Sequence, residues 1–286
     1  MIFDTKPISA GLYFVATPIG SARDITLRAL DLLAGCDVIA AEDTRTARKL
    51  MAIHGVPLGK RPILAYHDHS GDAIRARIMA EIAAGKSVAY VSEAGTPLVA
   101  DPGYALGRAV IEAGLPLTAA PGASAVLAAL TVSGLPTDRF LFVGFLSAAK
   151  AQRETEIAEL RDMPFTLIFY ESPKRVSEML YSLSEIMGAE RRAVVCRELT
   201  KRFEQVTRGT LAELAADFSG KTPRGEIVVL VGRAGATEIL PATVEAALRE
   251  AMKTMRVKDA ATLVAGAMGL SRRHVYQTAL TMEPNE

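Results

Sequence analysis

The sequence predicts an α/β protein that ends in a small helical extension. Short apolar runs alternate with amphipathic helical patterns through the first half, which is typical of βα units and a largely parallel, doubly wound sheet. In the second half, the strand-like run at residues 202–209 is followed closely by a short helix and another strand, which indicates some antiparallel pairing and hence a mixed sheet in a second α/β domain. Beyond Pro241 the patterns are helical. We expect α/β domains at residues 1–136 and 137–234 and a helical extension at residues 241–286.

The elements can be placed from their periodicity. In the first half, helical patterns include the spacings Leu27-Leu30-Leu33 and Ile74-Ile78-Ile82. In the second half, helices are expected at about 150–161 and 173–187, and residues 232–236 read as a short linker. The predicted strands lie at residues 11–16, 37–41, 62–66, 87–92, 116–120, 140–145, 165–170, 192–196, 203–208 and 227–231.

Composition fits a globular protein and limits its partners. The 286 residues are 50% hydrophobic and carry a net charge of +1, so an RNA contact would depend on local basic clusters. Residues 113–137 are uncharged, but prolines interrupt them, so we expect no membrane span. The first residues lack the order of a secretory signal, and Cys36 and Cys196 are expected to be free buried thiols. Both observations favour the cytoplasm.

Three glycine- and proline-containing loops follow predicted strands of the first half. The string TPLVADPG at residues 96–103 follows one strand, TPIG at 17–20 a second, and PGASA at 121–125 a third, in which Ser124 can cap a helix. Loops of this kind leave backbone amides free at the carboxyl ends of strands, where open α/β sheets bind ligands. Together the three loops predict a small-molecule pocket.

A fourth strand exit carries the string AEDTR at residues 41–45, and with it the N-terminal half resembles the tetrapyrrole methylases, which use S-adenosylmethionine. Within that class, the chain is similar to the ribosomal RNA small subunit methyltransferase I family, which methylates a cytidine 2′-hydroxyl. The resemblance spans about residues 11–232. Further matching strings are GFL at 144–146, FYESP at 169–173, RELTK at 197–201 and GE at 225–226. The chain departs from the family pattern at Ser21, Ala22, Glu93, Ser147 and Lys174.

The resemblance implies two α/β domains of the tetrapyrrole-methylase type with a cofactor cleft between them. It also implies a cytoplasmic homodimer that binds S-adenosylmethionine and methylates 16S rRNA in the small ribosomal subunit. A tetrapyrrole or a protein is the alternative acceptor, although the long basic tail favours a macromolecule. A dehydrogenase is disfavoured, because no Gly-x-Gly-x-x-Gly follows Ala16. A non-catalytic RNA-binding adaptor would need only the tail.

The same resemblance and the strand exits nominate site residues. Each set has a structural alternative: Asp43 or Thr44 could cap a helix, Asp101 and Ser172 could be N-caps, and the RELTK ion pairs could be structural. A direct Lys201 base would need a depressed pKa. The expected catalytic residues are Glu42, Asp43, Arg45, Glu198 and Lys201; the expected cofactor-binding residues are Pro18, Gly95, Thr96, Pro97, Asp101, Ser124, Ala125, Tyr170, Glu171 and Glu226.

The tail resembles a helix-turn-helix, with Gly269 in the turn and Ser271 as a cap. Residues 249–274 contain six basic and two acidic side chains. We expect Arg272, Arg273 and the more distant Lys174 to bind RNA, and the alternative is a helical cap with a solvated charged face. His67 and His69 are too isolated to predict a metal site, so no metal is expected.

Overall fold

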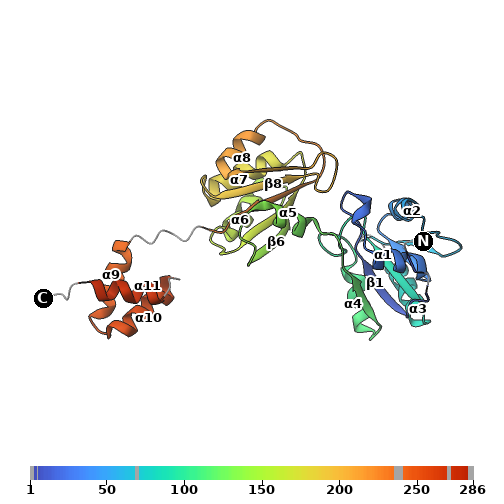
Figure 1. Cartoon of the computed structure of the whole chain (residues 1–286), viewed down its shortest axis with the longest axis horizontal. Helices are drawn as coiled ribbons and strands as arrows, with labels where there is room; N and C mark the ends of the chain where they lie inside the picture. Colours follow the sequence, from blue (N-terminus) through green and yellow to red (C-terminus); the bar gives the residue numbers. More distant parts are fainter. Residues whose placement is uncertain (1–2, 5, 68–70, 235–240, 269–271, 283–286) are drawn as a thin grey trace. The chain divides into compact units, whose positions relative to one another are not determined.

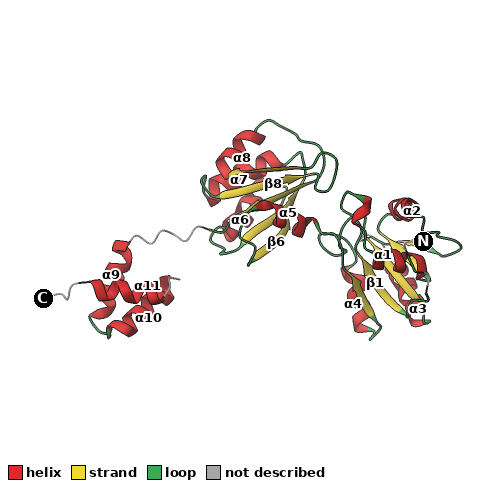
Figure 2. Ribbon diagram, viewed as in Figure 1, coloured by secondary structure: helices red, strands yellow, loops and turns green. Residues whose placement is uncertain are grey.

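The structure is a computed structural model that describes residues 3–4, 6–67, 71–234, 241–268 and 272–282 (Figure 1). It divides into two compact units, Met1–Arg233 and Ala234–Glu286. The first unit contains two sheets and the second is helical (Figure 2). None of the described helices has the length and apolar character needed to cross a bilayer.

The first sheet is parallel throughout its described strands, as predicted, with the order β3-β2-β4-β1-β5. Alternate strand residues face two apolar clusters: Ile39 and Val91 pack with α1 and α2, while Val38 and Tyr90 pack with α3 and α4. The sheet is therefore covered on both faces, which explains why its strands are short apolar runs. Its strands are β1 (Gly11–Val15), β2 (Val38–Ala41), β3 (Ile63–Ala65), β4 (Ser87–Val91) and β5 (Leu117–Ala120).

Helices follow each of these strands. Those between the strands are η1 (Ala22–Asp24), α1 (Leu27–Gly35), α2 (Thr44–Ile53), α3 (Asp72–Ala83) and α4 (Tyr104–Glu112), and α5 (Ala125–Ser133) follows the last strand, β5. The last of them differs from the others, because Val126, Ala129 and Leu130 of α5 pack against the second sheet. Helix α5 therefore packs on the second sheet, together with Ile19 and Val99 from loops of the first half.

The second sheet is mixed, as predicted, with the order β6-β7-β10-β8-β9 in the described chain. Strands β6 and β7 are parallel, and the remaining neighbours are antiparallel. Helices α6, α7 and α8 cover one face and α5 covers the other. Its elements are β6 (Phe140–Phe145), α6 (Lys150–Leu160), β7 (Thr166–Glu171), α7 (Val176–Met187), β8 (Arg192–Arg197), β9 (Gln205–Thr210), α8 (Leu211–Phe218) and β10 (Ile227–Val231).

Two predicted helix caps are wrong. Helix α7 begins at Val176. Ser172 and Pro173 form a turn before it, and the Ser172 carbonyl accepts hydrogen bonds from the backbone N–H groups of Arg175 and Val176. Helix α4 begins after Gly103, whose φ of 120° turns the chain into the helix, so Asp101 is not its cap. Ser124 does occupy the N-cap position of α5, but its side chain makes no capping hydrogen bond.

The second unit has its own small core. Its described helices are α9 (Pro241–Met252), α10 (Val257–Met268) and α11 (Arg272–Thr281). Ala265 and Val275, predicted to lock two helices together, are both buried in the same cluster with Leu248. The predicted turn residues Gly269 and Ser271 lie outside the described residues.

Candidate functional site

A cavity of about 370 Å³ lies where the carboxyl-end loops of the first sheet meet the ends of strands β6, β7 and β10 of the second. The loops are joined by backbone contacts: Thr17 and Gly95 exchange two hydrogen bonds, of 2.9 and 3.1 Å, and the Thr96 hydroxyl donates to the Ala123 carbonyl at 2.9 Å. The three predicted loops thus form one wall. The residues that line the cavity are Ile19, Ala94, Gly95, Thr96, Val99, Asp101, Ser124, Ala125, Phe145, Tyr170, Glu171, Ser172, Pro173, Gly225, Glu226, Ile227 and Val228.

Most of the residues nominated for cofactor binding meet at this cavity. Pro18 and Pro97 do not line it; each sits beside a lining residue, Ile19 or Thr96, and limits the backbone of its loop. Sequence reasoning missed the apolar walls, including Val99, because an apolar side chain beside a loop glycine looks like ordinary core. The nominated residues at the cavity are Gly95, Thr96, Asp101, Ser124, Ala125, Tyr170, Glu171 and Glu226.

Gly95 allows the loops to approach each other. Its φ is 81°, in the region that favours glycine, and a Cβ there would lie 3.3 Å from the Ile19 Cγ2 atom. A larger side chain would therefore be strained and would also crowd the cavity wall.

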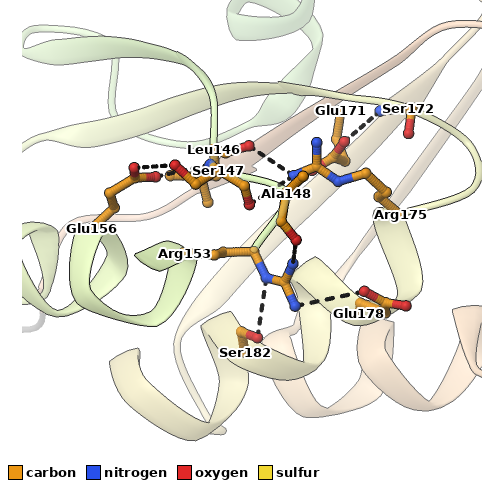
Figure 3. Close-up of polar contacts among 10 residues, drawn as sticks. All are labelled: Leu146, Ser147, Ala148, Arg153, Glu156, Glu171, Ser172, Arg175, Glu178 and Ser182. Atoms are coloured by element: carbon orange, nitrogen blue, oxygen red, sulfur yellow. Dashed lines mark hydrogen bonds and ion pairs between the residues drawn. The ribbon is translucent and has the colours of Figure 1, made fainter. Parts of the chain in front are cut away.

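The opposite wall depends on Glu171, at the end of β7 (Figure 3). Its side chain is fully buried, one carboxylate oxygen accepts the Ser172 N–H at 2.7 Å, and the other lies 3.2 Å from Arg175 Nη2. The same Arg175 nitrogen donates to the carbonyls of Leu146, at 2.7 Å, and Ser147, at 3.0 Å. Arg175 therefore ties Glu171 to the segment that follows the lining residue Phe145.

Further contacts fix that segment to α6 (Figure 3). Ser147 donates both its N–H and its hydroxyl to Glu156. Arg153, whose side chain is 3% exposed, donates to the Ala148 carbonyl at 3.2 Å and lies 3.6 Å from Glu178. Arg153 thus braces the same segment without touching a residue that lines the cavity.

Asp101 is a carboxyl group whose pKa is shifted well above its ordinary value. It is half-buried in the cavity wall, and burial, followed by the charge of nearby Glu42, raises its pKa to about 6. Glu42 itself accepts the Glu93 N–H at 3.1 Å. A carboxyl group with this pKa can hold or release a proton near neutral pH.

The Asp43–Arg45 pair has a clear structural role. Asp43 is the N-cap of α2: it accepts the Arg45 N–H at 2.7 Å, and both its oxygens accept from the Arg45 guanidinium. These hydrogen bonds lower the Asp43 pKa to about 2. The capping alternative is therefore confirmed for Asp43, and neither residue lines the cavity. The Arg45 side chain remains 90% exposed.

The RELTK segment places Lys201 beside the cavity. Its ammonium lies 2.8 Å from Glu198 and 3.0 Å from the lining residue Glu226. Burial lowers the Lys201 pKa, but the hydrogen bonds to the two carboxylates outweigh burial, and the pKa lies above its ordinary value. The Lys201 hydrogen bond, and then the Glu226 N–H, lower the pKa of Glu198. Lys201 is therefore a fixed cation and does not have the depressed pKa that a base requires.

The residues nominated for RNA binding are all on the surface. Lys174 is exposed next to the lining residue Pro173, and Arg272 and Arg273 are exposed in the first turn of α11, in the second unit. No group of metal-binding side chains occurs among the described residues, and His69 lies outside them. Cys36 and Cys196 are free and buried, and burial raises the pKa values of these thiols to about 11 and about 12.

Comparisons with known proteins identify the family. Residues 11–215 match the model of the Tetrapyrrole (Corrin/Porphyrin) Methylases, and residues 238–283 match that of the RsmI C-terminal HTH domain. A ribosomal RNA small subunit methyltransferase I of Mesorhizobium japonicum is 44% identical, over 97% of this chain and 94% of its own. A Xylella fastidiosa protein of the same name is 43% identical, over 93% of this chain and 97% of its own. The chain belongs to the ribosomal RNA small subunit methyltransferase I family of tetrapyrrole methylases.

Solved structures share the fold of this methyltransferase. The methyltransferase CobJ has a TM-score of 0.59 at 21% identity, covering 79% of this chain and 95% of its own. A uroporphyrin-III C-methyltransferase of Thermus thermophilus, complexed with S-adenosylhomocysteine, has a TM-score of 0.54 at 20% identity, covering 78% and 98%. At such identities the likeness shows the fold alone.

Proposed function

We propose that this methyltransferase transfers the methyl group of S-adenosylmethionine to the 2′-hydroxyl of a cytidine in small-subunit (16S) ribosomal RNA. The observation that carries the proposal is the cavity, at which eight of the residues nominated for cofactor binding meet. The names of the relatives support ribosomal RNA as acceptor over a tetrapyrrole or a protein.

The residues that line the cavity suit the chemistry of the cofactor. Apolar side chains such as Val99 and Ile227 suit the adenine ring, and the largely exposed carboxylate of Glu226 suits a positive charge of the methionine part. Gly95, in its left-handed conformation, leaves room against Ile19. Bound there, S-adenosylmethionine supplies an activated methyl group on a sulfonium.

The chain's own contribution would be positioning and proton removal. Holding the acceptor in line can supply about 7–11 kcal/mol at the best geometries. Asp101 is the best candidate for the group that takes the hydroxyl proton, because its pKa of about 6 leaves it ionised but basic at neutral pH. Lys201 stays protonated and would offset negative charge on the ribose oxygen or a phosphate. Glu42 lies beside Asp101, whereas Arg45 is accessible to RNA phosphates.

Incubation with methyl-labelled S-adenosylmethionine and unmethylated small ribosomal subunits tests the proposal. We expect label on a ribose of the RNA, located by mass mapping, with Arg45→Ala lowering turnover more than cofactor affinity. Label on a base or on protein, or none at all, would contradict it. A cytoplasmic homodimer also remains a prediction, and sedimentation of the purified chain tests the dimer.

A further inference from the structure

An exposed aromatic side chain sits on the turn between β8 and β9. Phe203 is 63% exposed and belongs to none of the apolar clusters of the described residues. The guanidinium carbon of Arg202, which is also exposed, lies 5.3 Å from the centre of its ring. The fold therefore gains little from an aromatic residue here, and the ring presents a surface to solvent.

The turn that carries this ring is held in a strained conformation. Glu198 and Thr200 have φ values of 52° and 62°, which are unfavourable for non-glycine residues and most of all for a β-branched one. Side chains hold the strain in place: the Thr200 N–H donates to the Glu204 carboxylate at 2.6 Å, and its hydroxyl accepts the Ser21 N–H at 3.1 Å. Strain maintained in this way is a property of functional segments.

The turn also adjoins the cavity. Lys201, two residues before Phe203, contacts the lining residue Glu226, and Gly225 leaves no space for a Cβ against Glu198. The nearby carboxylates already have partners within the protein, since Lys201 holds Glu198 and Glu226 while Glu204 accepts from Thr200. The exposed ring of Phe203 therefore lies next to a positive charge, that of Arg202.

A ring and a guanidinium on a turn that contacts the cavity lining through Lys201 suit an unpaired nucleobase. Bases of single-stranded RNA stack on aromatic faces and on arginine planes, whatever their identity. A ribose that enters a cavity of this kind must leave its own base stack, and its neighbours then lose a stacking partner. A ring on a rigid turn can replace that partner.

We propose that Phe203, supported by Arg202, stacks on an unpaired base of the RNA next to the ribose that enters the cavity. This inference rests on the proposed function for its substrate. It makes Phe203 an RNA-binding residue outside the cofactor cavity and independent of the helical tail.

Kinetics on small ribosomal subunits provide the first test. Phe203→Leu, which keeps an apolar side chain but no ring, should raise the KM for subunits between about fivefold and about a hundredfold. Phe203→Tyr should restore it, and the cofactor dissociation constant should be unchanged in both. The control is Tyr181→Leu, because Tyr181 is a similarly exposed ring, 58%, on α7. Wild-type KM in Phe203→Leu, or an altered oligomeric state, would overturn the proposal.

Fluorescence separates this proposal from the proposed function. The chain contains no tryptophan, so Phe203→Trp and Tyr181→Trp each introduce a single fluorophore. A single-stranded oligoribonucleotide spanning the methylated nucleotide should quench the emission of the Phe203→Trp variant and leave that of the Tyr181→Trp variant unchanged. Binding detected by anisotropy without selective quenching would refute stacking even if methylation is intact. Selective quenching without methylation would instead uphold the stacking site and count against the proposed reaction.

Discussion

At the scale of single residues, the titration of Asp101 gives the proposed reaction a pH dependence. Its pKa is about 6, so the carboxyl is mostly protonated below pH 6 and ionised above it. Only the ionised form can accept the hydroxyl proton. We expect kcat/KM, which reports the pKa values of the free enzyme, to rise tenfold per pH unit below about 6 and to level off above it. Asp101→Asn should lower kcat by about 10²- to 10⁴-fold at pH 8.

The same substitution, Asp101→Asn, should stabilise the folded protein although it slows the reaction. Because folding raises the Asp101 pKa from 3.8 to about 6, the folded state loses stability as the pH rises from about 4 to about 6, and the full cost of ionising the carboxyl is present above pH 6. Asp101→Asn should therefore raise the Tm at pH 8 and leave it nearly unchanged at pH 4. Glu93→Gln is the control, since Glu93 is exposed and does not line the cavity; removing its charge should shift the profile slightly to lower pH without lowering the rate at pH 8. If the pH profile of the rate is the same in Asp101→Asn as in the wild type, another group accepts the hydroxyl proton.

Arg175 is a positioning residue in the same site. Arg175→Met leaves the fully buried Glu171 carboxylate without its cation and releases the carbonyls of Leu146 and Ser147. Breaking a buried ion pair costs about 3–5 kcal/mol, and partial exposure of Arg175 favours the lower end. We expect the KM for S-adenosylmethionine to rise about tenfold, with kcat changing much less.

The control for Arg175 is Arg153→Met, which affects the same segment through Ala148 but touches no residue that lines the cavity. It should lower the Tm and leave the KM for the cofactor unchanged. Equal KM changes in the two variants would mean that Arg175 acts only through general stability.

At the scale of elements, the loop after β4 must pass close to the loop after β1. Gly95→Val places a branched side chain at a φ of 81° and 3.3 Å or less from Ile19. We expect cofactor binding to be abolished, as measured by isothermal titration. Gly114→Val is the control for backbone strain, because Gly114 has a φ of 65° with open space around it. Equal cofactor affinity in the two variants would place the adenosyl group elsewhere.

The bounds of an element were predicted best where its sequence pattern fits only one kind of structure. Strands buried on both faces, such as β4 and β10, are continuous apolar runs bounded by loop residues, and their positions were predicted to within a residue. The start of α7 was wrong by three residues because Ser172 and Pro173 fit both a helix start and a turn. Local chemistry favours both, and packing around Glu171 selects the turn.

The candidate site was partly predictable for the same reason. Glycine loops indicate a cavity directly, since few other residues adopt their conformations. The bond between Lys201 and Glu226 joins residues 25 positions apart and depends on the pairing of β8 with β10, which no local pattern encodes. The raised pKa of Asp101 likewise depends on its burial in the cavity wall and then on Glu42, from another strand exit.

At the scale of the whole molecule, the two units divide the expected tasks. The first holds the cavity and the second holds the exposed arginines of α11. The described residues that line the cavity all belong to the first unit. We therefore expect the second unit to contribute to RNA binding and not to cofactor affinity.

Arg272 and Arg273 lie in the first turn of α11, where positive charge opposes the helix dipole by about 0.3–1 kcal/mol per charge. An RNA phosphate would relieve this arrangement. We expect the double change to alanine, or truncation after residue 235, to weaken binding to the small ribosomal subunit without changing cofactor affinity. The slope of log K against log salt should become shallower by about 0.7–0.9 for each phosphate that the variant no longer neutralises.

The control is the replacement of Arg249 and Lys253 by alanine, which removes the same charge. Both side chains already pair with glutamates on α9, so subunit binding and its salt slope should change little. Equal losses of subunit binding in the two double variants would mean that the tail acts only by general electrostatic attraction. No loss of binding in either variant would mean that the tail is a structural cap.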